Sequence, residues 1–200
     1  MYVCTLNEHL TDEQRSLISK TSFVWFLQLS GKVILNTKIL RELTMKWVDS
    51  NNGFVIGDKV LTMNEKDFCL GLGLSLEGGS INLKDTMVKS TCVKYLGKGI
   101  KDLNFIYKFL LKKHKKEISC DVFCSLYILV GISEILFPKR YGRVFPIMFD
   151  IIDNLSRLSN YCWGNLVYRY LLKSLSKASD SVKKGKSRSE VEVNGCVYML

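Results

Sequence analysis

Cysteine and histidine are the residue types in this sequence that could support nucleophilic catalysis or metal binding. Cys120 and Cys124 stand four positions apart, which places both thiols on one face of a helix, and His114 lies shortly before them. A zinc site would need a fourth ligand, and a cysteine nucleophile would need a base with an orienting group. The other histidine, His9, lies in an unrelated stretch. Because apolar residues surround the two thiols, we expect both to pack in a core.

Glycine-rich and lysine-dependent cofactor sites are not supported either. The stretch GLGLSLEGG, residues 71–79, resembles a phosphate-binding loop only in composition. A dinucleotide site places such a loop between a strand and a following helix, whereas here a predicted helix precedes the glycines. A pyridoxal-phosphate enzyme would need a Schiff-base lysine in a large α/β fold, and strands do not alternate with helices. We therefore predict that the protein is not an enzyme and holds no cofactor or metal.

Two basic clusters are the feature that points to a partner. The formal net charge is +10 at pH 7, which favours acidic partners such as nucleic acid. The candidate residues for nucleic-acid contact or nuclear import are Lys112, Lys113, Lys115, Lys116, Lys183, Lys184, Lys186 and Arg188. A solvated surface would have the same composition, because lysines near a helix C-terminus also complement the helix dipole. Both interpretations stay open.

The elements that must position these residues are predicted to be mostly helices. Apolar residues recur at helical spacing along most of the chain. Asn36 and the pairs Thr11–Gln14 and Thr62–Glu65 are typical helix N-terminal caps. Later helices are predicted over 85–96, 103–117, 118–137, 147–158 and 161–178.

One segment departs from the helical pattern. In FVIGDKVL, residues 54–61, two β-prone runs flank Gly57-Asp58, which is typical of a two-residue hairpin turn. The predicted fold class is therefore mainly α, with a small β-hairpin near 54–62. No internal repeat or change of composition indicates a second domain, so we expect a single helical domain over 1–200, with a basic loop at about 179–190.

The apolar segment 118–137 resembles a membrane span in composition but contains charged residues. Asp121 and Glu134 lie within it, and an ionised side chain deep in lipid costs at least ~2.5 kcal/mol. Its longest uncharged part, 122–133, is too short to cross a bilayer. We expect a buried central helix and no membrane association. The 7 Cys form no CxxC pair, so reduced thiols in an intracellular protein are expected.

Short motifs follow one another in an order that is more specific than any one of them. A Leu-Phe-Pro occurs in LFPKRYGRVFP, and a Tyr-x-Trp-Gly opens a predicted helix in NYCWGNLVYRYL. These motif residues are Leu136, Phe137, Pro138, Tyr161, Trp163 and Gly164. With LTMNEKDFCLGLGL upstream and GCVYML downstream, the chain resembles the plant mobile domain over about 36–200. This module, found in the maintenance-of-meristems proteins, is often labelled aminotransferase-like.

The resemblance implies a mostly helical, non-enzymatic nuclear interaction module that acts in transposon silencing, gene-expression control and meristem development. It also implies protein partners, among them a phosphatase-like protein. Because the family continues past GCVYML, we expect the chain to be incomplete at its C-terminus or to derive from a transposon-related copy. The alternative is a direct, sequence-indifferent nucleic-acid-binding protein or a transposon-encoded accessory protein.

Gly164 is an unusual choice inside a predicted helix, directly after the large side chain of Trp163. Glycine in a helix interior is about 1 kcal/mol less favourable than alanine. We expect Trp163 to anchor a core and Gly164 to let another stretch of backbone pass close to the helix. This interpretation of the motif is structural rather than catalytic.

Overall fold

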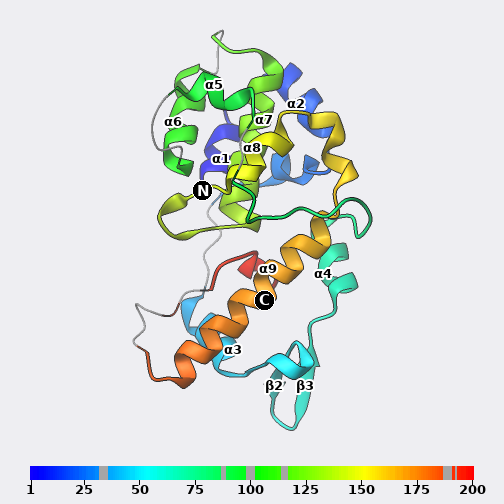
Figure 1. Ribbon diagram of the computed structural model, residues 1–200, viewed down its shortest axis with the longest axis vertical. Coiled ribbons are helices and arrows are strands. Elements are labelled where there is room, and N and C mark those ends of the chain that lie inside the picture. Colours follow the sequence, from blue (N-terminus) through cyan, green and yellow to red (C-terminus); the bar gives the residue numbers. More distant parts are fainter. Residues whose placement is uncertain (32–35, 87–88, 98–101, 114–116, 187–190, 192) are drawn as a thin grey trace. The chain divides into compact units, whose positions relative to one another are not determined.

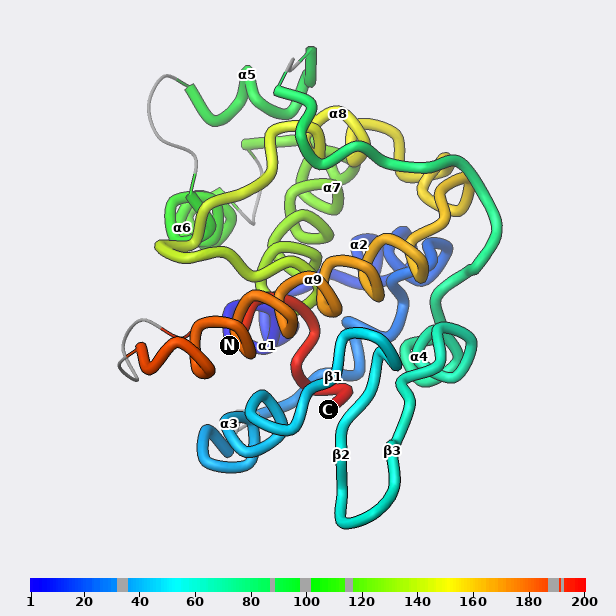
Figure 2. Tube along the Cα trace, turned by 60° about the horizontal axis from the view of Figure 1, so that its bottom comes forward, coloured from blue at the N-terminus to red at the C-terminus, as the bar shows by residue number. Residues whose placement is uncertain are grey.

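The computed structural model of the chain consists of two compact units, and each unit is assembled from two separate segments of the chain. Unit 1 comprises residues 1–33 and 77–161, and unit 2 comprises residues 34–76 and 162–200. The structure describes residues 1–31, 36–86, 89–97, 102–113, 117–186, 191 and 193–200. Figures 1 and 2 show the elements of both units. A single domain over 1–200 stays a prediction.

Unit 1 is built from helices around one central helix. Its α-helices are α1 (Tyr2–Asn7), α2 (Asp12–Ser19), α5 (Cys92–Leu96), α6 (Leu103–Lys113), α7 (Cys120–Gly131) and α8 (Pro146–Ile152). A π-helical turn continues α7 over Ile132–Leu136, and 3-10 turns cover Val24–Gln28 and Leu155–Asn160. Helices α1, α2, α6 and α8 all pack against α7 (Figure 1).

The central helix α7 is buried because its sequence is apolar on all sides. Every residue from Phe123 to Gly131 is buried, as expected for a helix that has no polar face. The hydroxyl of Ser119 accepts the N–H of Val122 at 3.4 Å and caps the first turn. The expected buried central helix is therefore present, although its last turn widens into a π-helix before Pro138.

Two polar side chains of this central segment bind α1. The Tyr127 hydroxyl donates to the Asn7 side-chain oxygen at 2.7 Å, and both residues are buried. The Glu134 carboxylate accepts the N–H groups of Tyr2 and Val3 at 2.7 and 3.0 Å. Because α1 has no capping side chain of its own, Glu134 satisfies amides that would otherwise lack a partner within the helix.

Unit 2 combines three helices with a small antiparallel sheet. The helices are α3 (Thr37–Met45), α4 (Glu65–Leu72) and α9 (Trp163–Lys183), and the strands are β1 (Trp47–Val48), β2 (Gly53–Ile56) and β3 (Lys59–Thr62). Short 3-10 turns cover Asp49–Asn51 and Val197–Met199. The strand order is β1-β2-β3, so β3 is an edge strand. Figure 2 shows β2 and β3 as a hairpin.

Helix α9 organises unit 2 by packing against α3, α4 and β1. Its buried apolar residues recur at the spacing of one helix face; they are Trp163, Val167, Tyr168, Leu171, Leu175 and Ala178. Polar side chains on the same helix fix the start of α4. The Tyr168 hydroxyl donates to the Met63 carbonyl at 2.7 Å, and the Asn165 amide donates to the Glu65 carboxylate at 2.5 Å.

Several sequence-based predictions are confirmed. The fold is mainly α with a small hairpin at the predicted place. Thr11 and Gln14 form the predicted capping box. The Asn36 side chain accepts the N–H groups of Lys38 and Ile39 at 3.1 and 3.2 Å, so it caps α3 as expected.

Other predictions are wrong in ways that have physical causes. The start of α4 is capped by Asn64, whose side chain accepts the Lys66 N–H at 2.8 Å, and not by the predicted Thr62–Glu65 box. The predicted basic loop does not begin at 179, because Ser179 is fully buried and α9 continues to Lys183. Of the helix predicted over 85–96, only α5 is present within 89–97.

Candidate functional site

The Leu-Phe-Pro motif, residues 136–138, lies at the end of the central helix of unit 1. Leu136 and Phe137 are buried, and the Phe137 ring meets the Phe145 ring edge-on, with centroids 6.3 Å apart. The proline follows where the helix must stop. Tyr161 is half-buried and forms a single β-bridge with Gly79. These four motif residues therefore contribute packing and chain direction to unit 1.

Trp163 and Gly164 open α9 in unit 2 and form a close packing joint. Trp163 has no exposed surface. The Gly164 N–H donates to the Ser75 carbonyl at 2.9 Å. A Cβ atom at Gly164 would lie 2.8 Å from that oxygen and 3.1 Å from Cβ of Cys69, with the Cys69 sulfur nearer still. A residue with a side chain would not fit without a shift of the backbone around Ser75.

The buried thiols are poorly suited to nucleophilic chemistry. Burial raises the pKa of Cys69 to about 11 and the pKa of Cys196 to about 12. Burial also raises the pKa of Cys124, with the neighbouring Cys120 adding to the effect. A thiol is reactive as the thiolate, so these groups stay protonated at neutral pH. His114, the candidate base near Cys120 in sequence, lies outside the described residues.

The nearest approach to a catalytic cluster is a set of donors around Asp153 in unit 1. The carboxylate accepts the Ser90 hydroxyl at 2.7 Å and the backbone N–H groups of Thr91 and Cys92 at 2.5 and 3.1 Å. Burial opposes ionisation of Asp153, but hydrogen bonds from Cys92, Ser90 and the two amides outweigh it and lower its pKa. Burial raises the pKa of Cys92 to about 12. This cluster anchors the start of α5.

The described part of the chain contains no arrangement of side chains that could hold a metal ion. No group of three or more His, Cys, Asp or Glu side chains converges there. Cys120 and Cys124 share a helix face as predicted, but the Cys124 thiol donates to the Gln14 carbonyl at 3.6 Å. Among the described helices, none has both the length and the hydropathy needed to cross a bilayer.

The predicted basic residues fall at the ends of two helices, one in each unit. Lys112 and Lys113 end α6 in unit 1, where Lys113 pairs with Glu117 four residues later. Lys183 ends α9 in unit 2, and Lys184 and Lys186 follow it as exposed residues. Lys115, Lys116 and Arg188 lie outside the described residues.

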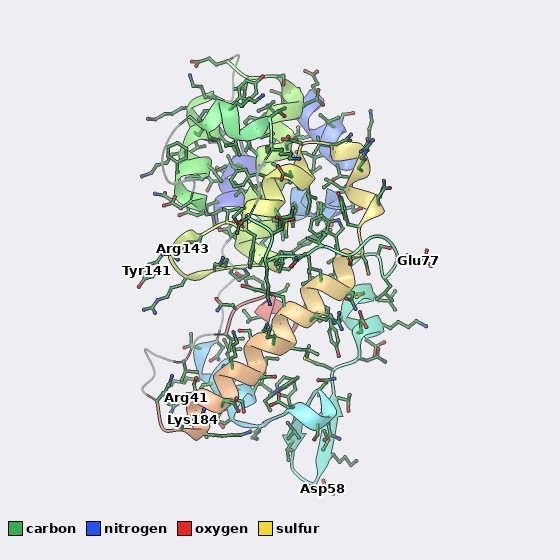
Figure 3. The ribbon with its side chains drawn as sticks, viewed as in Figure 1. Arg41, Asp58, Glu77, Tyr141, Arg143 and Lys184 are labelled. Carbon is green, nitrogen blue, oxygen red and sulfur yellow. The ribbon has the colours of Figure 1, made fainter. Side chains whose placement is uncertain are left out.

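A pocket of about 410 Å³ in unit 2 involves α3, the end of α9 and the residues that follow α9. It is lined by Thr37, Lys38, Leu40, Arg41, Thr44, Val182, Lys186, Val191 and Val193. Figure 3 labels Arg41, a lining residue on α3, and Lys184, which marks the end of α9 and is not part of the lining. The lining therefore combines cationic groups with aliphatic side chains, a composition that suits small anionic ligands.

Sequence reasoning did not single out the loop between α7 and α8. Residues 139–143, hereafter the 139–143 loop, contain Lys139, Arg140 and Arg143 around Tyr141. Tyr141 is 74% exposed and has a positive φ of 61°. The sequence signal that could have found this loop is the presence of three cations and an aromatic residue within five positions.

This geometry defines a mainly α scaffold without an assembled reaction centre among the described residues. The chain belongs to the family described as Domain of unknown function (DUF8566), whose model matches residues 1–200. It is 26% identical over 206 residues to Protein MAINTENANCE OF MERISTEMS of Arabidopsis thaliana, an alignment that covers 96% of this chain and 41% of that protein. No solved structure matches the chain.

Two further relatives from Arabidopsis thaliana have the same coverage of this chain. Protein MAIN-LIKE 1 is 25% identical over 96% of the chain and 39% of its own length. Protein MAIN-LIKE 2 is 23% identical over 96% of the chain and 29% of its own length. The predicted relation to the plant mobile domain of the maintenance-of-meristems proteins is therefore confirmed. The chain spans about two fifths of the length of the first of these relatives.

Proposed function

We propose that this chain is a non-enzymatic nuclear interaction module with a role in transposon silencing, gene-expression control or meristem development. The observation that carries the proposal is the position of the family motif. Trp163 is fully buried and Gly164 lies against Ser75, so these two motif residues stabilise the fold and take no part in a reaction. The surface residues are then available for contact with a partner. The relative's name, Protein MAINTENANCE OF MERISTEMS, supports the developmental part of the proposal.

An exposed apolar hairpin supports contact with a protein partner, for which a phosphatase-like protein is our candidate. The side chains of Val55, Ile56, Val60 and Leu61 are 38–62% exposed on β2 and β3. Strand β3 is also the edge of the sheet, so it presents unpaired backbone groups beside these side chains. Val55 and Val60 pair on one face of the hairpin, while Ile56 and Leu61 lie on the other. Apolar side chains exposed beside a free strand edge are typical of protein-binding surfaces.

A domain exchange in Arabidopsis thaliana tests the proposal. The region of Protein MAINTENANCE OF MERISTEMS that matches this chain is replaced by the chain, and the fluorescent fusion is expressed in plants that lack the relative. We expect nuclear fluorescence and restored repression of transposon transcripts. A Val60→Thr/Leu61→Lys version should lose repression, while a Lys173→Gln control on the exposed side of α9 should keep it. Exclusion of the fusion from the nucleus contradicts the proposal.

Sequence-indifferent nucleic-acid binding is the second candidate function. It is supported by Lys112, Lys184 and Lys186, which are exposed and have no acidic partner among the described residues. Phosphate contacts of this kind make affinity fall steeply with salt. We expect neutralisation of these three lysines to reduce the slope of log Kd against log salt. Identical salt slopes for the variant and the parent protein would contradict this role.

A further inference from the structure

The 139–143 loop of unit 1 holds an aromatic residue in a conformation that aromatic residues rarely adopt. The Gly142 N–H donates to the Lys139 carbonyl at 3.0 Å, which closes a four-residue turn. Tyr141, the third residue of that turn, has φ 61° and ψ 22°. Turns with a positive φ at this position favour glycine or asparagine. A bulky residue there is strained, and such strain is concentrated at functional sites.

The strained turn presents the Tyr141 ring to solvent. The side chain is 74% exposed, although the guanidinium of Arg140 lies 5.0 Å from the ring centroid. Figure 3 labels Tyr141 and Arg143 on this loop, where both side chains project away from the ribbon. An exposed aromatic face beside a guanidinium group is the arrangement that accepts a stacked base together with its phosphate.

The positive charge of this loop is not neutralised by the protein. Lys139, Arg140 and Arg143 have no ion pair with any acidic side chain that the structure describes. The Lys139 ammonium lies 4.0 Å from the centroid of the Phe145 ring. Burial and the nearby Arg143 charge lower the pKa of Lys139. Three cations within five residues, without an acidic partner among the described residues, favour the binding of an anion.

We propose that the 139–143 loop binds single-stranded nucleic acid. Tyr141 stacks on an unpaired base, and the cations of the loop contact the flanking phosphates. This inference rests on the second candidate function and adds to it a site and a preference for single strands. The preference arises because the bases of a duplex are already stacked on one another and do not offer a free face to Tyr141. Every base has a π-face, so no sequence preference is expected.

Fluorescence anisotropy with a labelled oligo-dT, an oligo-U and a matched duplex tests this inference. The decisive variant is Tyr141→Gly, because glycine adopts the positive φ without strain and should keep or raise the unfolding midpoint. We expect its affinity for both single strands to fall about 5- to 100-fold. Tyr141→Phe should retain binding. Tyr95→Ala, at an exposed tyrosine of α5, is the matched control and should also retain binding.

The charge contribution is measured separately with the triple variant Lys139→Gln/Arg140→Gln/Arg143→Gln. Loss of three phosphate contacts should reduce the slope of log Kd against log salt by about 2. Equal affinity of Tyr141→Gly and the parent protein would overturn the inference and leave the second candidate function intact. Absence of binding to any nucleic acid at low salt would overturn both. Stronger binding to anionic phospholipid vesicles, lost in the same variants, would assign the loop to membranes and overturn the inference.

Discussion

Replacing Gly164 by alanine is the sharpest test of the packing joint at the start of α9. The added methyl would lie 2.8 Å from the Ser75 carbonyl oxygen and 3.1 Å from Cβ of Cys69, inside the ~3.5–4.0 Å optimum for non-bonded carbon atoms. Overpacking of this kind costs about 1–3 kcal/mol. A shift of α9 that relieved the contact would stretch the 2.9 Å bond from the Gly164 N–H, which stabilises the fold by about 0.5–1.5 kcal/mol.

Helix propensity acts in the opposite direction, since alanine is favoured over glycine by up to about 1 kcal/mol. The net expectation is that Gly164→Ala lowers the free energy of unfolding by up to about 2 kcal/mol, because the steric cost of about 1–3 kcal/mol exceeds the propensity gain of up to about 1 kcal/mol. Urea titration followed by circular dichroism measures this change. The matched control is Gly71→Ala in α4, where the new methyl would meet only the mobile end of the Met199 side chain, 2.5 Å away.

The outcome of a double variant identifies the neighbour that resists the methyl. Cys69→Ala removes the sulfur atom nearest to the new methyl but leaves the Ser75 carbonyl in place. The Cys69→Ala/Gly164→Ala variant should therefore recover part of the lost stability, with a coupling energy of about 0.5–2 kcal/mol. If Gly164→Ala is as stable as the parent protein or more stable, the close-contact reasoning is refuted.

Three other predictions concern burial and charge. Trp163→Ala should lower the free energy of unfolding by about 3–5 kcal/mol, while Lys173→Ala on the exposed face of α9 should stay within ~0.5 kcal/mol; equal effects would contradict burial of Trp163. The pKa of Asp153 is lowered in the fold, so its stabilisation is full above its unfolded pKa of about 3.9 and is lost as pH falls through the folded pKa. Asp153→Asn should therefore flatten the acid limb of a stability–pH curve. Iodoacetamide at pH 8 should modify half-buried Cys162 before buried Cys124, as mass spectrometry of tryptic peptides can check.

Local patterns in the sequence predicted the elements because the forces that form them act between neighbours. The Thr11–Gln14 capping box and the Asn36 cap involve residues at most three positions apart, and both are present. The helical spacing of apolar residues predicted a helix over 161–178, where α9 lies, and Gly57-Asp58 predicted the hairpin. Helix ends were less predictable, since burial of Ser179 extends α9 past the point where its composition becomes polar.

Contacts between distant residues could not be predicted, because they leave no periodic pattern. Glu134 caps α1 across more than a hundred residues, although in the sequence it only marked an ionised group within an apolar run. Ser75 meets Gly164 in the same way, so the sequence could indicate that a backbone passes close to Gly164 but not which one. The positive φ of Tyr141 could not be predicted from the sequence either, because a positive φ at that position of a turn is usually marked by glycine.

The division of each unit into two segments has a consequence for synthesis on the ribosome. The first segment of unit 2 ends at residue 76, and α9, which it packs against, begins only after the intervening residues 77–161 have been made. At a translation rate of about 5–20 residues per second, α3, the sheet and α4 wait on the order of 4–17 seconds for that helix. During this interval Trp47 and Phe68, which end up buried, are open to chaperones. Slow codons within 77–161 should therefore increase chaperone dependence.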